Sequence, residues 1–209
     1  MDVAIVDYGM GNVYSVASAV RFLGGRPELT ADPSRIEHAD RVILPGVGSF
    51  ARAMERITDR RLDQVLAAIA QQAGRRLLGI CLGMQLLGLS STEDGLTRGL
   101  GLVPLDVQHL GVGLGAPSKV PHIGFSRLSG HRHLRMFDGT NHHSAYYFVH
   151  SFRMSTTTAM DHVRIATCTY GYAFTAAIEA GAVWGTQFHP EKSQSAGLRV
   201  LHNFLKPYK

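Results

Sequence analysis

Cys81 lies between two glycines in the stretch Gly79-Ile80-Cys81-Leu82-Gly83, at the end of an apolar run. A Gly-x-Cys-x-Gly pattern between a strand and a helix predicts a tight turn that lifts a nucleophile above the sheet. The glycines allow a backbone path that a side chain would block. A helix beginning at Leu82 would point its positive end at the sulfur and favour the reactive thiolate. The alternative is a cysteine that only packs in the core, and this motif alone does not decide between the two.

A thiolate nucleophile needs a base, and the base needs a group that orients it. His189 and Glu191 are two residues apart after the apolar run 182–188, so on an extended segment they share one face. Pro190 restricts His189 to extended geometry. Glu191 could then accept a hydrogen bond from one imidazole nitrogen while the other nitrogen faces Cys81. The alternative is an edge loop with a solvated histidine and glutamate.

The third requirement is a pair of N–H groups that stabilise the negative oxygen formed during acyl transfer. The stretch 45–50, Pro-Gly-Val-Gly-Ser-Phe, ends another apolar run, and Gly46 and Gly48 allow its amides to turn inward. We expect the amide of Val47 or Gly48, together with that of Leu82, to form this oxyanion hole. Taken alone, the stretch is also typical of an ordinary glycine turn.

The elements that must position these residues follow from the apolar pattern of the first half of the chain. Short apolar runs at 3–6, 41–44 and 77–80 predict buried strands. Helical spacing follows each run, from Val16 to Leu23, in a long pattern from Met54 to Ile69, and from Leu82 through Leu89. Alternating strands and helices predict a parallel sheet covered on both faces, with ligands bound at the carboxyl ends of the strands.

The second half of the chain has a different pattern. Its β-like runs cover residues 103–110, 146–152, 163–170 and 173–188, and an amphipathic helix is predicted over 195–205. We expect these strands to extend the same sheet with antiparallel additions. No linker rich in proline, serine or charge separates the halves. The sequence therefore predicts one α/β domain over residues 1–209, with a central, mostly parallel twisted sheet flanked by helices.

The composition indicates a globular protein with a hydrophobic core, since 45% of the 209 residues are apolar and 18% are charged. No apolar run reaches the length of about 18 residues that a membrane span needs. The first residues lack the features of a signal peptide, so we expect a cytoplasmic protein with no membrane partner. The net charge of +5 comes from scattered lysines and arginines without interleaved aromatic residues, so we expect no nucleic-acid partner.

Cysteine and histidine usage predicts no disulfide scaffold and no metal centre. Two cysteines, Cys81 and Cys168, are too few for a disulfide scaffold, and Cys168 lies in a β-like run where packing is the simpler interpretation. Four histidines fall in a polar, turn-like region, at positions 131, 133, 142 and 143. A metal site needs converging ligands in a closed geometry. We expect these four histidines to be solvated loop residues.

Together, the three motifs resemble those of the class I (triad) glutamine amidotransferase family, in the same order along the chain. Four further stretches are similar to the glutaminase subunits of imidazole glycerol phosphate synthase: DYGMGN, KVPHIGF, YYFVHSF and YGYAFTAA. The resemblance covers essentially the whole chain. It implies the class I amidotransferase fold over residues 1–209, and it favours a nucleophilic Cys81 over a packing one.

The resemblance also implies a reaction and the residues that perform it. In this family a thiolate attacks the side-chain amide of glutamine, ammonia leaves, and water releases glutamate from a γ-glutamyl thioester. Cys81 would be the nucleophile, His189 would carry the proton, and Glu191 would orient His189. The residues implied to hold the substrate glutamine are Gly46, Gln85, His150, Ser151 and Phe152. No cofactor is implied.

A further implication is a partner that receives ammonia through a dry conduit. In the resembled family the partner is a (β/α)₈-barrel cyclase, and the heterodimer makes imidazole glycerol phosphate for histidine biosynthesis. The implied docking residues are Asn12, Phe125, Tyr147 and Lys192. We hypothesise that docking flips a peptide of the loop at 45–48 into its productive form. The stretch PHIGFS departs from the usual PHMGWN at Phe125 and Ser126, both near the expected docking face.

Three alternatives remain open from the sequence. The first is a related subunit that supplies ammonia to an amidotransferase of bacterial surface sugars. The second is a free-standing cysteine hydrolase, such as a peptidase or γ-glutamyl hydrolase, which would act without a partner. The third is a binding module that has kept the fold, against which the intact set of Cys81, His189 and Glu191 argues.

Overall fold

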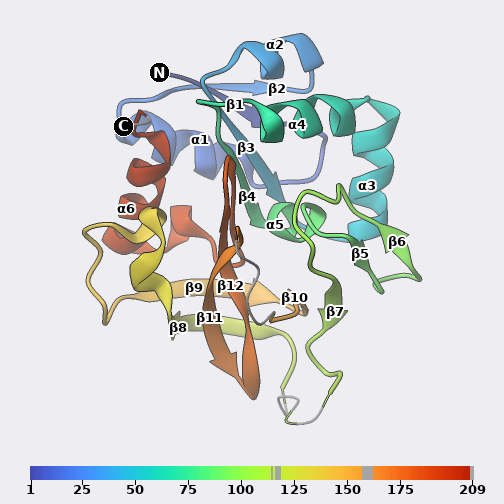
Figure 1. Cartoon of the computed structure of the whole chain (residues 1–209), viewed down its shortest axis with the longest axis vertical. Coiled ribbons are helices and arrows are strands. Elements are labelled where there is room, and N and C mark those ends of the chain that lie inside the picture. Colours follow the sequence, from blue (N-terminus) through green and yellow to red (C-terminus); the bar gives the residue numbers. More distant parts are fainter. Residues whose placement is uncertain (114, 116–118, 157–161, 208–209) are drawn as a thin grey trace.

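The computed structural model describes residues 1–113, 115, 119–156 and 162–207. A long twisted sheet runs through the molecule, and helices cover it on both sides (Figure 1). The α-helices are α1 (Val13–Phe22), α2 (Pro33–His38), α3 (Phe50–Asp59), α4 (Leu62–Gln71), α5 (Leu82–Leu86) and α6 (Gln194–Leu205). Short 3-10 helices cover His131–His133, Arg135–Phe137 and Pro190–Lys192.

The strands of the main sheet fall into a parallel half and a mainly antiparallel half. The parallel half runs in the order β2 (Arg26–Thr30), β1 (Asp2–Val6), β3 (Arg41–Gly46), β4 (Leu77–Cys81) and β13 (Val183–Thr186). The other half contains β12 (Tyr172–Ala180), β11 (Arg164–Tyr170), β10 (Phe152–Met154), β7 (Val107–His109), β5 (Ser90–Ser91) and β6 (Thr97–Arg98). A separate antiparallel pair is formed by β8 (His122–Arg127) and β9 (Ala145–His150). The predicted α/β architecture is confirmed.

Alternate residues of the parallel strands face two different cores. In β1, Val3 and Ile5 pack on the side of α1 and α6, whereas Ala4 and Val6 pack on the side of α2, α3 and α4. All four side chains are buried. Burial of both faces explains why the predicted strands were continuous apolar runs rather than alternating ones. Full burial of a valine or isoleucine stabilises the fold by about 1.5–3 kcal/mol.

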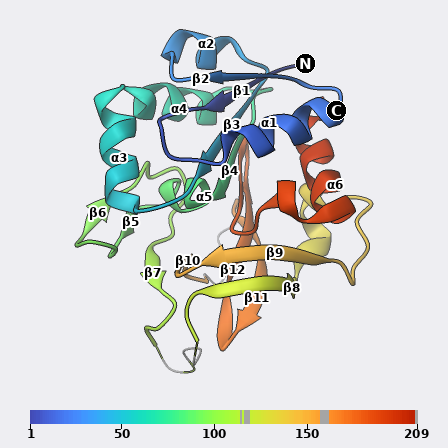
Figure 2. The same cartoon turned by 180° about the vertical axis from the view of Figure 1, so that it is seen from behind.

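The carboxyl ends of β3, β4 and β13 meet at one edge of the sheet, because these strands are parallel neighbours. Gly46 of β3 is level with Cys81 of β4, and Thr186 of β13 is level with Ile80. The β8–β9 pair lies beyond this edge, at the opposite end of the molecule from α2 (Figure 2). Three motifs that are distant in the sequence are therefore brought to one place.

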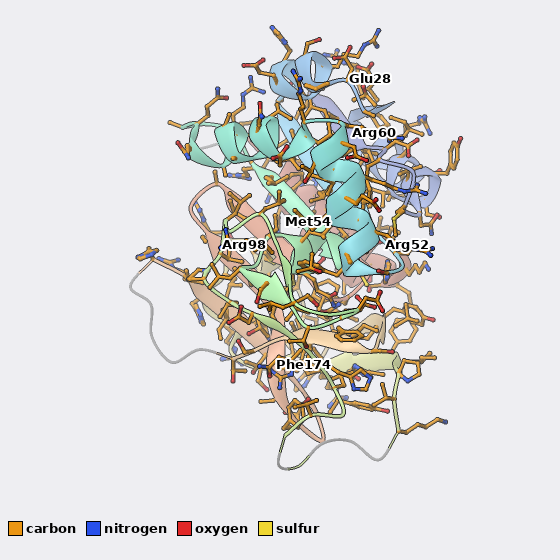
Figure 3. All side chains as sticks on the ribbon, turned by 90° about the vertical axis from the view of Figure 1, so that its right-hand side faces the viewer. Glu28, Arg52, Met54, Arg60, Arg98 and Phe174 are labelled. Atoms are coloured by element: carbon orange, nitrogen blue, oxygen red, sulfur yellow. The ribbon has the colours of Figure 1, made fainter. Side chains whose placement is uncertain are left out.

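The long helix predicted from Met54 to Ile69 is wrong, because two helices occupy this region. The chain turns between α3 and α4 at Arg60 and Arg61, and Arg61 has a left-handed φ of 56°. Figure 3 shows Arg60 at the corner between the two helices. A single straight helix would carry its apolar stripe away from the sheet, whereas the corner lets both helices bury their apolar faces.

The helix predicted from Leu82 through Leu89 is too long, because α5 ends at Leu86. The amide of Leu89 donates to the Leu105 oxygen (2.9 Å), which takes the chain away from the helix. A Cβ on Gly88 would lie 2.5 Å from the same oxygen, so this exit requires glycine. The short helix leaves Leu89 almost half exposed.

In the second half, the predictions hold for element types more than for element lengths. The run 173–188 contains two strands, β12 and β13, and the run 103–110 contains only the short β7. The predicted terminal helix is confirmed as α6.

His131 was expected to be solvated, but it is buried, with its ring 5.3 Å from that of Phe137. None of the helices in the described part of the chain is both long and apolar enough to span a bilayer.

Candidate active site

The turn at Cys81 is a strained link between β4 and α5. Cys81 has φ 55° and ψ −112°, a combination that residues other than glycine seldom adopt. A Cβ on Gly79 would lie 2.6 Å from the Gly83 oxygen, and a Cβ on Gly83 would overlap the Leu44 oxygen. Both glycines of the motif are therefore required by close packing of α5 on β3 and β4. The turn places the sulfur at the carboxyl edge of the sheet.

His189 and Glu191 follow β13 and form a buried pair. His189 has extended geometry (φ −92°, ψ 100°), and its Nδ1 lies 2.8 Å from Glu191 Oε1. The two side chains are only 4% and 1% exposed. The backbone of His189 is fixed to β9, since its N–H donates to the Tyr147 oxygen (2.9 Å) and its carbonyl accepts from Ser193 Oγ (2.6 Å). The extended geometry expected next to Pro190 is present.

Nδ1 of His189 is used by Glu191, so the ring interacts with Cys81 through its other nitrogen, Nε2. No described residue makes a hydrogen bond of good geometry to Nε2, although Cys81 is close enough to act on the ring. Burial lowers the pKa of His189, but the interactions of the ring with Cys81 and Glu191 outweigh burial and raise the pKa to about 9. The raised pKa favours the protonated form of the His189 imidazole, which can give a proton to a leaving group.

The loop after β3 forms another wall of the site. A Cβ on Gly46 would lie 2.6 Å from the Tyr8 hydroxyl, and Gly48 has a left-handed φ of 98°. Between them, Val47 is 45% exposed. These two glycines fit a backbone that packs closely against the turn at Cys81, because Gly46 is paired in register with Cys81. The structure therefore brings this loop next to the sulfur, as the sequence predicted.

The sulfur opens into a cavity of about 230 Å³. Its lining residues are Val47, Gly48, Cys81, Leu82, Gln85, Glu93, Val149, His150, Ser151, Phe152 and His189. Drug-sized ligands occupy pockets of about 300–1,000 Å³, so this cavity fits a smaller molecule such as one amino acid. Of the residues predicted to hold glutamine, only Gly46 is absent from this lining, because it lies behind the loop against Tyr8.

Gln85 is held by two hydrogen bonds from its amide nitrogen. Nε2 donates to the Phe152 oxygen (2.8 Å) and to Gln187 Oε1 (3.0 Å). Both hydrogens of the amide are thereby used, and none of the described residues donates to its carbonyl oxygen. Gln85 can therefore offer a ligand an acceptor but not a donor.

Two residues near the sulfur were missed in the sequence, Glu93 and Gln187. Glu93 lines the cavity and accepts from the amide of Phe50 (2.9 Å), at the start of α3. Burial raises the pKa of Glu93, and the Phe50 amide partly opposes this. Gln187 is fully buried, and its Nε2 lies 3.7 Å from Cys81 Sγ. Glu93 follows a strand too short to recognise, whereas Gln187 directly precedes the Phe-His-Pro-Glu stretch and could have been suspected.

Comparison with known proteins decides the family. The family model for class-I glutamine amidotransferases matches residues 4–207. The chain belongs to this family. It is 44% identical to imidazole glycerol phosphate synthase subunit HisH 2 of Nitrobacter winogradskyi, covering 98% of this chain and 97% of the relative. It is 39% identical to imidazole glycerol phosphate synthase subunit HisH of Escherichia coli, covering 99% of this chain and all of the relative.

Solved structures agree with this assignment at the level of the fold. A glutamine amidotransferase crystal structure matches with a TM-score of 0.72 and 16% identity, over 97% of this chain and 96% of that chain. The structure of PurLQS from Thermotoga maritima matches with a TM-score of 0.72 and 19% identity, over 98% and 97%. These structures show the class I amidotransferase fold, and the family match and the curated relatives show glutamine amidotransferase activity.

Three of the four predicted docking residues of this amidotransferase lie together. The rings of Phe125 and Tyr147 are 5.5 Å apart across β8 and β9, and Lys192 Nζ lies 5.8 Å from the centre of the Tyr147 ring. Phe125 is 51% exposed and its neighbour Ile123 is 61% exposed. Asn12 comes from a separate element, at the start of α1. We call Ile123, Phe125, Tyr147 and Lys192 the hairpin face.

Proposed function

We propose that this chain is the glutaminase subunit of an imidazole glycerol phosphate synthase, with residues 1–209 acting as one amidotransferase domain in the cytoplasm. It would hydrolyse glutamine through a cysteine thioester and pass ammonia to a cyclase. The observation that carries the proposal is the buried His189–Glu191 pair beside the strained Cys81, at the wall of a cavity of amino-acid size. The names of the relatives supply the pathway.

The chemistry at the sulfur uses all three residues of the triad. The Sγ proton of Cys81 passes to His189 Nε2, and the thiolate attacks the side-chain amide carbon of glutamine. The imidazolium then gives its proton to the leaving nitrogen, so ammonia departs and a γ-glutamyl thioester remains. Water, deprotonated by His189, releases glutamate and restores the thiol. Glu191 holds the ring by accepting from Nδ1–H and stabilises the imidazolium.

The negative oxygen formed in both tetrahedral intermediates needs N–H donors. We assign this role to the amide of Leu82, directly after the nucleophile, and to that of Val47 or Gly48 across the cavity. The loop from Gly46 to Gly48 is tied at its far end, because Ser49 Oγ donates to Asp94 Oδ2 (2.8 Å). Docking of the partner would set the peptide of this loop in its productive orientation.

Glutamine itself is an α-amino acid with two charged ends, and the cavity offers a complement to its cationic end. The carbonyl oxygen of Gln85 and the carboxylate of Glu93 would accept hydrogen bonds from the α-ammonium group. The residues at the junction of β9 and β10, His150, Ser151 and Phe152, would hold the α-carboxylate end. Burial lowers the pKa of His150 to about 3, with its bond to Phe152 opposing and His122 and His189 adding to this effect, so His150 stays neutral.

Released ammonia would take up a proton in water and lose its nucleophilicity, so the enzyme needs a partner seated over the site. We propose a (β/α)₈-barrel cyclase that docks on the hairpin face and on Asn12 to form a heterodimer. If so, glutamine hydrolysis should be stimulated by the partner together with its acceptor ligand. An isolated chain that hydrolyses glutamine as fast as the complex would contradict this coupling.

The decisive experiment replaces the nucleophile. Cys81→Ala should lower glutamine-dependent ammonia production by the complex at least about 10³-fold, because the thioester can no longer form. Synthesis by the partner from added ammonium salt should continue. Cys168→Ala is the matched control, since Cys168 lies buried in β11 away from the cavity, and it should keep full activity. A Cys81→Ala enzyme with full glutaminase rate would refute the assignment.

One observation favours a second candidate, a subunit that feeds ammonia to an amidotransferase of bacterial surface sugars. Phe125 and Ser126 replace the tryptophan and asparagine usual in the resembled family, and Phe125 lies in the hairpin face. Ser126 is turned inward, with its Oγ 2.9 Å from His122 Nε2. Purified chain should stimulate product formation by a cyclase partner in the first case and by a sugar amidotransferase in the second.

A further inference from the structure

Gln187 is a buried polar residue that the proposed mechanism leaves without a role. It follows β13 directly, and β13 and β4 are parallel neighbours in which Thr186 is level with Ile80. Gln187 is therefore level with Cys81. Its side chain is fully inaccessible, and its Nε2 lies 3.7 Å from the Cys81 sulfur.

The direction of the Gln187 amide is fixed by its neighbours. The oxygen and nitrogen of an amide have nearly the same shape, so only hydrogen bonding distinguishes the two orientations. A backbone carbonyl can only accept, and the Phe152 oxygen lies 2.8 Å from the amide of Gln85, so Gln85 must place its NH₂ group there. The same NH₂ group contacts Gln187 at 3.0 Å, so that contact must be with the Gln187 oxygen. The NH₂ group of Gln187 is then forced towards Cys81.

We propose that Gln187 is a further catalytic residue, whose side-chain N–H is held against the sulfur of Cys81 and stabilises the thiolate. This inference rests on the proposed role of Cys81 as the nucleophile. The donor opposes an unfavourable neighbour, because the Val149 carbonyl oxygen also lies 3.9 Å from the sulfur and repels a negative charge there. A hydrogen bond to a charged group in a water-excluded site is stronger than one between neutral groups.

In this proposal His189 and Gln187 have different roles at the sulfur. His189 supplies the positive charge and exchanges the proton, whereas Gln187 supplies a fixed dipole that never changes its protonation. Because Gln85 uses both of its hydrogens, it locks Gln187 and contacts the cavity at the same time. Gln85 is therefore a positioning residue for the sulfur as well as a predicted contact for glutamine.

The test measures the thiolate directly, without glutamine turnover. The rate of Cys81 alkylation by iodoacetamide is followed against pH by mass spectrometry of the Cys81 peptide. Gln187→Met keeps the volume and removes the donor, and Gln187→Glu places a negative charge beside the sulfur. Both should move the midpoint of the alkylation profile upward by about one pH unit and lower the rate at neutral pH about tenfold. Gln64→Glu, on the exposed face of α4, is the matched control and should leave the profile unchanged.

Circular dichroism establishes that each variant is folded. If Gln187→Met does not fold, Gln85→Met provides the second test, because it keeps Gln187 but releases its amide to rotate, and the midpoint should rise by a smaller amount. A folded Gln187→Met with the wild-type midpoint would overturn the proposal. The two ideas fail separately, since loss of the nucleophile assignment would appear as glutaminase activity in Cys81→Ala, whatever the alkylation profile.

Discussion

The pair of His189 and Glu191 determines the pH range over which the sulfur keeps a protonated neighbour. The folded protein raises the pKa of His189 above its ordinary value, to about 9. The protonated form therefore stabilises the fold fully below pH 6.5, and this contribution is lost as the pH rises towards 9. The glutaminase rate should fall over the same range, since the leaving nitrogen needs the imidazolium proton.

Glu191→Gln tests this single carboxylate. The amide oxygen can still accept from Nδ1–H, but the negative charge is gone, so the pKa of His189 falls. We expect kcat to decrease about 10²-fold or more and the alkaline limb of kcat/KM to move below pH 9. Steady-state glutaminase assays of the complex from pH 6 to 10 measure both. Glu55→Gln on the exposed face of α3 is the control, and an alkaline limb that stays in place in Glu191→Gln would contradict the role of Glu191.

At the scale of elements, the packing of α5 on the sheet sets the position of the nucleophile. A Cβ on Gly83 would overlap the Leu44 oxygen, whereas a Cβ on Gly11 would meet its nearest neighbour at 3.4 Å, an ordinary contact. Gly83→Ala should therefore force α5 off β3 and destabilise the protein by more than about 3 kcal/mol, with loss of activity. Gly11→Ala should change stability by less than about 1 kcal/mol. Urea unfolding followed by circular dichroism separates the two, and equal midpoints would show that the elbow tolerates a side chain.

The β8–β9 pair contains two buried histidines, His122 and His150, that are joined by a hydrogen bond. His150 Nδ1 donates to the Phe152 oxygen (2.7 Å), so its Nε2 accepts from His122 Nδ1 (3.1 Å). Burial lowers the pKa of His122 as well. Because the unfolded chain protonates His150 near pH 6.5 and the folded chain only near 3, stability is lost as the pH falls through this window.

His150→Gln removes this titration while keeping a polar side chain. Between pH 7 and pH 5, the free energy of unfolding should fall by about 2 kcal/mol less in the variant than in the wild type. Urea titrations at the two pH values give the difference. His38→Gln, on the exposed end of α2, serves as the control and should behave like the wild type. An identical loss in His150→Gln would mean that other groups cause the acid sensitivity.

The elements differ in how far the sequence predicts them. Strands β1, β3 and β4 are continuous apolar runs because both faces of the sheet are covered, and this pattern is local. The corner at Arg61 has no glycine or proline to mark it, so periodicity alone joined α3 and α4. Cys81, His189 and Glu191 stood out by residue type and spacing. Glu93 did not, since its position at the cavity depends on the contact with Phe50, which is distant in the chain.

At the scale of the whole molecule, the candidate catalytic residues and the proposed docking surface lie at the same end of the sheet, its carboxyl edge. The hairpin face lies beyond this edge, and its exposed apolar side chains, Ile123 and Phe125, belong to the same strand. Aromatic residues such as Phe125 and Tyr147 are enriched at the centre of protein interfaces. The cavity and the hairpin face share β9, so a partner seated on this face would close over the path that ammonia must take.

Phe125→Ala therefore tests assembly separately from catalysis. A buried aromatic anchor contributes about 2 kcal/mol or more to binding, so the Kd for the cyclase should rise about 30-fold, as measured by isothermal titration calorimetry. Alkylation of Cys81 and the melting temperature should not change, because Phe125 touches neither the sulfur nor the core. Phe22→Ala is the matched control, since Phe22 is 77% exposed at the end of α1 that is farthest from the carboxyl edge. If both variants bind the cyclase as tightly as the wild type does, the partner docks elsewhere, and the ammonia path must leave the cavity by another side.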